Sequence, residues 1–185
     1  RGLRLYALPI HCLMGLGPTL SMFSCGESKQ EESKSSVEVG SVTTIVKDIQ
    51  AANGLNKGKT FTSESTVAGE YLDEALISSY YGNVLDVPNF TKIEEYCVYI
   101  EDFDTNLRIE IGIFKVINSN DNTMVSDFLK LRKERILEHA RNYPSVDAEP
   151  FANVIIDTIG NYTYYVAVKE NRTEINKSIR EKLGA

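Results

Sequence analysis

The sequence has little of what metal sites and disulfide frameworks require. It contains three cysteines, two histidines and no tryptophan in 185 residues. The cysteines stand at positions 12, 25 and 97, so no two of them have the short spacing of a zinc or redox motif. His11 and His139 are also far apart in the sequence. We therefore expect no metal centre, no cofactor and no disulfide.

Positive charge is also scarce. Lysine and arginine together number 20 against 26 acidic residues, which gives a formal net charge of −6. The first 24 residues contain two arginines and no acid, so the rest of the chain is more acidic still. Because an acidic domain does not attract phosphate backbones, nucleic acid is excluded as an expected partner.

A long uninterrupted apolar run is missing as well. Residues 5–23 are mostly apolar, but prolines and glycines break them below the roughly 20 apolar residues of a membrane-spanning helix. With two arginines in front, the stretch has the pattern of a secretory signal, which has a basic start, an apolar centre and a small residue before the cleavage site. Met22-Phe23-Ser24-Cys25 resembles a bacterial lipobox, in which the cysteine is lipidated and becomes the mature N-terminus.

We therefore expect residues 1–24 to be a signal segment and Cys25 to be the lipid anchor. The alternative is a buried N-terminal helix with a chance cysteine. Residues 26–36 contain no apolar side chain. This composition predicts that residues 25–41 form a polar, flexible tether. The expected location is extracytoplasmic, with the membrane as a partner through the acyl chains, since several chains hold firmly where one is marginal.

Apolar periodicity predicts a single α+β domain over residues 42–185. Helices are expected over residues 42–52, 71–81, 123–142 and 173–183, where apolar side chains recur every three or four positions. Alternation predicts strands over residues 93–101, 107–117, 154–159 and 162–168, and residues 55–68 are interpreted as a loop or a weak strand. Gly160-Asn161 joins the last two strands as a hairpin turn.

This order predicts a four-stranded antiparallel sheet made of two hairpins. The long helix and the C-terminal helix are expected to pack on the sheet, and two N-terminal helices precede it. Such an order is typical of domains whose helices lie on one face of the sheet.

One charged pair is predicted inside this domain. Glu110 lies among isoleucines on the strand 107–117, and Arg132 falls on the apolar stripe of the long helix. A half-buried carboxylate needs a partner, which predicts an ion pair of Glu110 with Arg132 or Arg135 that locks helix to sheet. A structural role is preferred for this pair, with ligand binding as the alternative.

Three stretches carry a resemblance to a known family. They are Glu110-Ile-Gly-Ile-Phe-Lys115, the helix with Arg132 and Arg135 that ends at Tyr143-Pro144, and Gly160-Asn-Tyr-Thr-Tyr-Tyr165. Through these motifs the chain from about Val42 onward resembles the bacterial lipoprotein family called domain of unknown function 4358. The resemblance implies a surface-attached lipoprotein of a Gram-positive bacterium and this fold. It implies no activity, because the motifs are structural.

Tyrosines are the strongest sequence indication of binding. Tyrosine combines an apolar ring with a polar tip, which suits a surface that meets a partner. An envelope protein or a glycan would be the partner of such a surface. The alternative is that these tyrosines are ordinary core and edge residues of a hairpin. The candidate residues are Tyr80, Tyr81, Tyr162, Tyr164 and Tyr165.

Three other features receive structural interpretations. Asp102-x-Asp104-x-Asn106 begins like a calcium loop, but Leu107 and Ile113 stand where such a loop needs glycine and glutamate. It is interpreted as a polar hairpin turn. Cys97, in an apolar strand, is expected to be a small buried side chain, and His139 a half-exposed helical residue.

The preferred function is a surface-anchored, non-catalytic binding module. The alternative is a cell-wall-directed hydrolase or peptide-processing enzyme that uses paired carboxylates as acid and base. The carboxylates that could converge in such an enzyme are Asp73, Glu74, Asp147 and Glu149.

Overall fold

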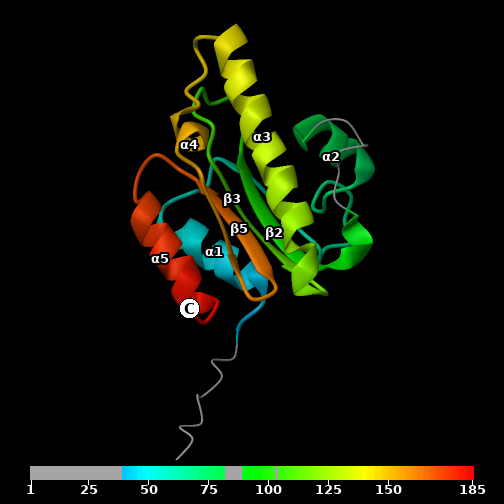
Figure 1. Cartoon of the computed structure of the whole chain (residues 1–185). Coiled ribbons are helices and arrows are strands. Elements are labelled where there is room, and N and C mark those ends of the chain that lie inside the picture. The colour runs from blue at the N-terminus through cyan, green and yellow to red at the C-terminus, as the bar shows by residue number, and fades with distance from the viewer. Residues whose placement is uncertain (1–38, 82–88, 103) are drawn as a thin grey trace, which may run out of the picture. The chain divides into compact units, whose positions relative to one another are not determined.

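The fold is taken from a computed structural model, which describes residues 39–81, 89–102 and 104–185 (Figure 1). Residues 36–185 form one compact unit. The predicted signal segment, the lipobox with Cys25 and nearly all of the predicted tether lie outside the described residues. None of the helices in the described part is both long and apolar enough to cross a membrane.

A five-stranded antiparallel sheet forms the centre of the domain, with the strand order β1-β2-β3-β5-β4. The strands are β1 (Gly58–Thr62), β2 (Ile93–Glu101), β3 (Glu110–Val116), β4 (Ile155–Ile159) and β5 (Tyr162–Ala167). The α+β class agrees with the prediction, but the predicted number of four strands is wrong. The extra strand, β1, has Phe61 as its only large apolar residue, so its sequence shows little alternation. Pairing with β2, which places Phe61 opposite Val98, makes this segment a strand.

Both predicted hairpins are present. β2 pairs with β3, and β4 pairs with β5 through a turn in which Gly160 has φ +56°. The polar turn before β3 closes with a 3.1 Å hydrogen bond from the Thr105 amide to the Asp102 carbonyl. The two hairpins join through β3 and β5, where Ile113 lies opposite Tyr164. This last pairing connects segments about fifty residues apart, so local sequence gives no sign of it.

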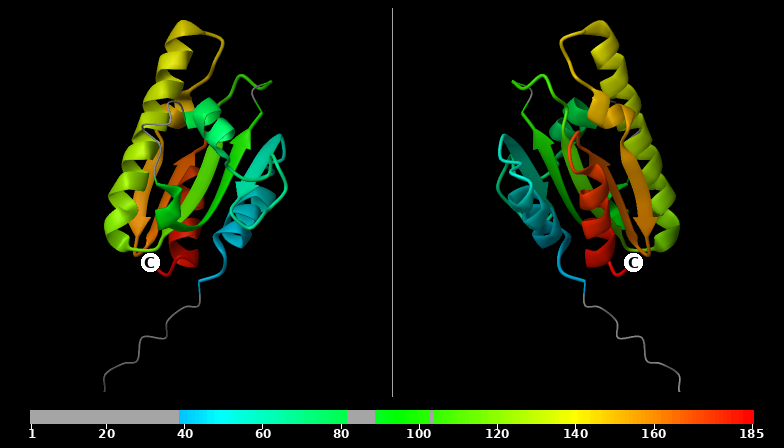
Figure 2. Two further views of the ribbon diagram at one scale, coloured as in Figure 1. Left: turned by 90° about the vertical axis from the view of Figure 1, so that its right-hand side faces the viewer. Right: turned by 90° about the vertical axis from the view of Figure 1, so that its left-hand side faces the viewer.

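Helices cover both faces of the sheet. The helices α1 (Val42–Ala52) and α5 (Arg172–Lys182) pack on one face. On the other face lie α2 (Glu74–Tyr81), α3 (Asn122–Asn142) and the one-turn α4 (Glu149–Ala152). Figure 2 shows the sheet between these two layers. Two short 3₁₀ helices, η2 (Phe90–Lys92) and η3 (Ser119–Asp121), precede β2 and α3.

The expectation that the helices share one face is therefore wrong. Both faces of the central strands are apolar, and each needs a cover. On β3, Ile111 and Ile113 belong to the core under α1 and α5, whereas Phe114 and Val116 belong to the core under α3. A strand that is apolar on both sides is typical of a sheet buried in the middle of three layers.

The largest difference from the predicted helix bounds is in α2; those of α3 and α5 differ by one residue. The second helix begins at Glu74 and not at residue 71, because Asp73 acts as its N-cap. The Asp73 Oδ1 atom accepts the Leu76 amide hydrogen at 2.8 Å, and its carbonyl accepts that of Ile77 at 2.9 Å. The short helix α4 is not among the predicted helices, and it has Pro150 in its first turn, where a missing amide hydrogen is tolerated.

Candidate functional site

A charged pair lies buried between the sheet and α3. Glu110 is 1% exposed and Arg132 is 4% exposed. The Arg132 Nε atom lies 3.1 Å from Oε1 and 3.2 Å from Oε2 of Glu110, and Nη2 also donates to Oε1. Of the two predicted pairings, the structure forms Glu110 with Arg132. Arg135 is exposed at the surface and does not contact Glu110 through a hydrogen bond or an ion pair.

The position of Glu110 follows from the register of the sheet. It opens β3 between Ile100 of β2 and Ala167 of β5. Two residues later, Gly112 leaves room for the ring of Tyr165, since a Cβ atom at Gly112 would lie 2.5 Å from the Tyr165 Cε1 atom. The Tyr165 hydroxyl can therefore cross the strand and donate to the Glu110 Oε2 atom at 3.0 Å.

Aromatic rings surround the guanidinium group of Arg132. Its Cζ atom lies 5.3 Å from the centroid of the Tyr81 ring and 5.8 Å from that of Phe151, within the range of cation–π attraction. Burial opposes the charge on Arg132, but the Glu110 carboxylate outweighs it and raises the pKa of the guanidinium. Burial also raises the pKa of the Tyr81 and Tyr165 hydroxyls, so both stay protonated near neutral pH.

A groove of about 430 Å³ opens above this buried pair, between α2 and α3. Ser79 and Tyr80, in the last turn of α2, form one wall. The other wall is one stripe of α3, whose members are separated by three or four positions as a helix face requires. The stripe consists of Arg132, Arg135, Ile136, His139 and Asn142, with Glu138 beside it.

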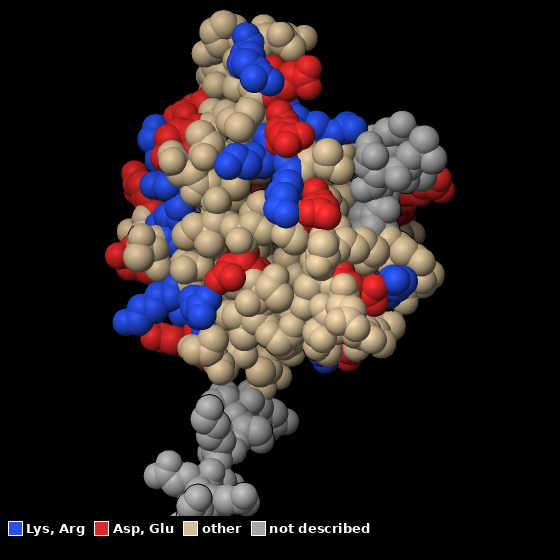
Figure 3. Space-filling model, viewed as in Figure 1, with Lys and Arg blue, Asp and Glu red and all other residues tan. Residues whose placement is uncertain are grey.

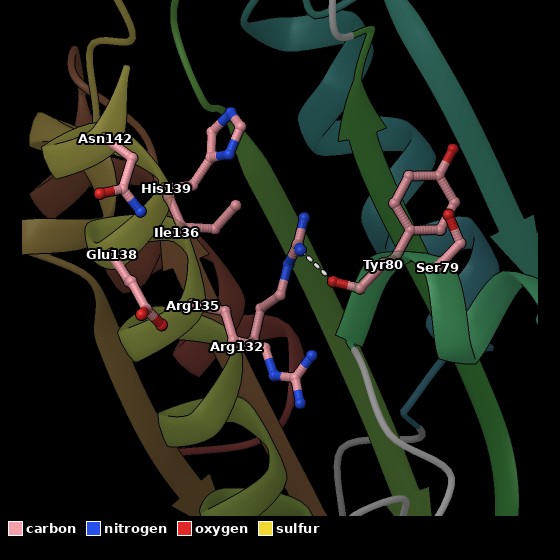
Figure 4. Close-up of a pocket in the computed structure, with 8 residues that line it drawn as sticks. All are labelled: Ser79, Tyr80, Arg132, Arg135, Ile136, Glu138, His139 and Asn142. Carbon is pink, nitrogen blue, oxygen red and sulfur yellow. Dashed lines mark hydrogen bonds between the residues drawn. The ribbon is translucent and has the colours of Figure 1, made fainter. Parts of the chain in front are cut away.

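Polar groups of the groove face inward at several points. Arg132 joins the two walls by donating from Nη1 to the backbone carbonyl of Tyr80. Figure 4 shows that Arg132, Arg135 and His139 project toward the side of α3 where Tyr80 lies. Glu138 is the carboxylate among the described lining residues. The His139 ring also packs against Tyr143, with the ring centroids 4.6 Å apart. The groove is therefore richer in hydrogen-bond donors than in acceptors.

The charge of the surrounding surface is mixed. Figure 3 shows lysine, arginine and acidic side chains close together over the C-terminal half of α3. The groove is thus a local feature and not part of an extended basic surface, which agrees with the acidic composition of the chain.

The predicted tyrosine face does not form. Tyr81 and Tyr165 are buried in the core under α3, and Tyr164 is buried on the opposite side of the sheet. Alternation along β5 sends Tyr164 and Tyr165 to opposite faces. Tyr80 and Tyr162 are half-buried, and only Tyr80 lines the groove. Three of the five tyrosines are therefore core residues, and the five share no surface.

The carboxylates that could have formed a catalytic pair have structural partners. Asp73 caps α2, Asp147 accepts a 2.8 Å bond from Lys169, and Glu149 pairs with Arg172 at 3.0 Å. The hydrogen bond from Lys169 lowers the pKa of Asp147, and that from Arg172 lowers the pKa of Glu149. Glu74 is exposed in the first turn of α2.

Metal and thiol chemistry find no support among the described residues. No group of three or more histidine, cysteine, aspartate or glutamate side chains in the described ranges is placed to hold a metal ion. Cys97 lies fully buried under α1, and burial raises the pKa of its thiol to about 12. The thiol is therefore un-ionised near neutral pH and packs as a small apolar group.

The sequence patterns did not predict the groove. Ser79 and Asn142 were not among the candidate site residues, and His139 was interpreted only as a half-exposed helical residue. The signal was present in the positions 132, 135, 139 and 142, which fall on one helix face. What the sequence could not show is that α2, about fifty residues earlier, forms the facing wall.

Comparison with protein-family models, curated proteins and solved structures found no match to this chain. The resemblance to domain of unknown function 4358 therefore stays a prediction. The functional argument rests on the groove and its donors.

Proposed function

We propose that this chain is a surface-anchored bacterial lipoprotein whose folded domain is a non-catalytic binding module. The observation that carries the binding role is the groove between α2 and α3, which gathers Arg132, Arg135 and His139 on one stripe. The proposed partner is a component of the cell envelope, either a protein or a glycan. The anchor is Cys25, as the lipobox-like sequence indicates.

The side chains around the groove favour binding over hydrolysis. Among the lining residues that the structure describes, His139 and Glu138 are the candidates for a general base, and the hydroxyls are those of Ser79 and Tyr80. A hydrolase of the paired-carboxylate type needs two facing carboxylates with room for substrate between them. Asp147 and Glu149 instead hold Lys169 and Arg172, which suits a structural role at the end of β5.

The anchor can be tested by metabolic labelling with a fatty-acid analogue in a Gram-positive host. The full chain behind a start methionine should incorporate the label and fractionate with membranes. Cys25→Ala should abolish both, because it removes the thiol that carries the lipid. Cys12→Ala is the matched control and should behave as the parent chain. Labelling that survives in Cys25→Ala would contradict the anchor.

The binding role can be tested with the Cys25→Ala chain as bait for solubilised cell envelopes. A defined protein or glycan should be recovered, and recovery should fall when the groove is blocked by the bulky, uncharged side chain of Ser79→Trp. The matched control is Ser78→Trp, at an exposed neighbouring position that does not line the groove. A component that both variants retain would place binding elsewhere.

The enzyme alternative has its own measurement. Purified peptidoglycan incubated with the Cys25→Ala chain should release neither new reducing ends nor new amino groups. Release that disappears in Asp147→Asn or Glu149→Gln would support the hydrolase instead. Both substitutions keep the size of the side chain and remove only the charge.

A further inference from the structure

We propose that the groove between α2 and α3 holds a single carboxylate or phosphate group of its ligand, bound by Arg132, Arg135 and His139. This inference rests on the proposed binding role and adds the chemistry of the ligand. It concerns one oxyanion and not a general attraction, since the surrounding surface carries both signs of charge.

Arg132, in the α3 wall of the groove, has N–H donors that no described residue accepts. A guanidinium group has five N–H hydrogens. The hydrogen bonds of Arg132 with described residues engage three of them: one on Nε and one on Nη2 toward Glu110, and one on Nη1 toward the Tyr80 carbonyl. One hydrogen on each terminal nitrogen has no partner among the described residues. Paired terminal N–H groups suit the two oxygens of a carboxylate or phosphate.

Arg132 is also held rigidly. Glu110, the Tyr80 carbonyl and the rings of Tyr81 and Phe151 surround its guanidinium group, so a ligand need not order it. Binding to a side chain that is already fixed avoids the entropy loss of ordering a mobile one. This is a reason for a buried arginine to lie under a surface groove.

Arg135 supplies the charge, because that of Arg132 is balanced by Glu110. Arg135 is exposed and has no ion pair or hydrogen bond with any residue in the described ranges. By contrast, Arg172 and Arg180 of α5 are paired with Glu149 and Asp157. An arginine prefers planar, bidentate contact with carboxylate or phosphate oxygens. Arg135 lines the groove one turn after Arg132 and is placed to make that contact.

The remaining lining fits the same ligand chemistry. His139 offers a ring N–H one turn further along α3, and Ser79 and Asn142 offer a hydroxyl and an amide. Glu138, the acidic residue among the described lining, is outnumbered by the donors of Arg132, Arg135 and His139. At about 430 Å³ the groove exceeds the size of an isolated ion and falls within the roughly 300–1,000 Å³ of small-ligand pockets. The oxyanion is therefore part of a larger molecule.

The test is an amide-NMR titration of the ¹⁵N-labelled Cys25→Ala chain. The probes are sodium acetate and sodium phosphate, each compared with sodium chloride at equal ionic strength. Saturable shifts are expected at residues 79, 80 and 132–142 with at least one of the two oxyanions and not with chloride. Preference for acetate identifies a carboxylate ligand, and preference for phosphate identifies a phosphate ligand.

Two arginine variants distinguish oxyanion binding at a specific site from attraction by the net charge of the domain. Arg135→Gln should weaken oxyanion binding about tenfold, the effect of losing one charge-assisted hydrogen bond. Arg141→Gln is the matched control, since Arg141 is equally exposed on the same helix but does not line the groove. It should leave the affinity unchanged. His139→Gln, which keeps a neutral N–H donor, should have a smaller effect than Arg135→Gln.

Two results would overturn the proposal. Equal weakening by Arg135→Gln and Arg141→Gln would mean that only net charge matters. Absence of any saturable shift with either oxyanion would mean that the groove takes no such group or is filled by a carboxylate of the chain itself. In that case, an envelope component still recovered through the groove would leave the binding role intact, so the two proposals fail separately.

Discussion

The two faces of the sheet are built differently. The face under α1 and α5 buries an almost purely apolar core, in which Cys97, Ile111, Ile113 and Val166 have no exposed surface. The face under α2, α3 and α4 buries an ion pair, Glu110 with Arg132, among its apolar and aromatic residues. Both faces are made by the same strands, since alternate residues of β3 point to opposite sides.

This difference is not explained by stability. A buried ion pair loses the hydration of both ions, and a well-packed apolar pair of similar volume is often equally stable or more stable. The apolar face shows that this sheet can pack without such a pair. The ion pair lies under the one side of the domain where α2 and α3 leave a groove, and its arginine lines that groove. The apolar face holds the fold, and the charged face combines packing with a surface site.

The largest effect is expected from breaking the ion pair. Glu110→Ala leaves the Arg132 guanidinium buried without its counter-charge, which should lower the free energy of unfolding by about 3–5 kcal/mol. Urea denaturation followed by circular dichroism measures this loss. The double variant Glu110→Leu with Arg132→Met should recover most of it, because neither charge is then buried. A loss below about 1 kcal/mol would show that water reaches the guanidinium.

A somewhat smaller effect is expected on the apolar face. Ile113→Ala removes three buried carbon atoms from a side chain with no exposed surface and should cost about 2–4 kcal/mol. Ile113→Val should cost only about 0.5–1.5 kcal/mol. Oxyanion binding in the groove should be unchanged in both, measured by NMR titration under conditions where each variant is folded. Weaker binding in either variant would show that the two faces are coupled through β3.

The next largest loss of stability is expected from a side chain added at Gly112, in the middle of β3. In Gly112→Ala the added methyl group would meet the Tyr165 Cε1 atom at 2.5 Å and the Val98 Cγ2 atom at 3.0 Å. Overpacking of this kind typically costs about 1–3 kcal/mol. Because the Tyr165 ring must move, its bond to Glu110 should weaken as well. Gly112→Ala with Tyr165→Leu should be less destabilised than the sum of the two single variants, and strict additivity would contradict this contact.

The smallest effect is one of pH on the apolar face. Burial raises the pKa of Cys97 and of Tyr99 to about 12 each, above the values of the unfolded chain. The folded state therefore keeps protons that the unfolded state releases. The stability from each group is complete below its unfolded pKa, so the effect is absent near neutral pH, and the stability falls as the pH rises toward 12.

Urea denaturation between pH 8 and pH 11 measures this dependence. Tyr99→Phe removes one of the two groups and keeps the ring, so its stability should fall less steeply with pH than that of the parent chain. Equal slopes for the two proteins would show that the Tyr99 hydroxyl ionises as readily in the folded state as in the unfolded one.

The sequence by itself determined the local parts of this protein. Apolar periodicity gave the exact bounds of α1 and β2 and placed α3 to within one residue, because these segments carry strong repeats and clear ends such as Gly54 and Pro144. The Gly160 turn fixed the last hairpin, since positive φ is easy for glycine. The sequence also predicted a cation beside Glu110, either Arg132 or Arg135, because a carboxylate on an apolar strand needs one; the structure forms the pair with Arg132.

Other features depend on distant neighbours that the sequence patterns do not reveal. β1 is a strand only because β2 supplies its partner, and the helices divide between two faces because both sides of β3 are apolar. Tyr164 and Tyr165 are core residues because each face of β5 is covered by a different helix layer. The groove exists because the end of α2 meets the stripe of α3 some fifty residues later. Long-range packing sets these features, and short-range sequence patterns do not carry that information.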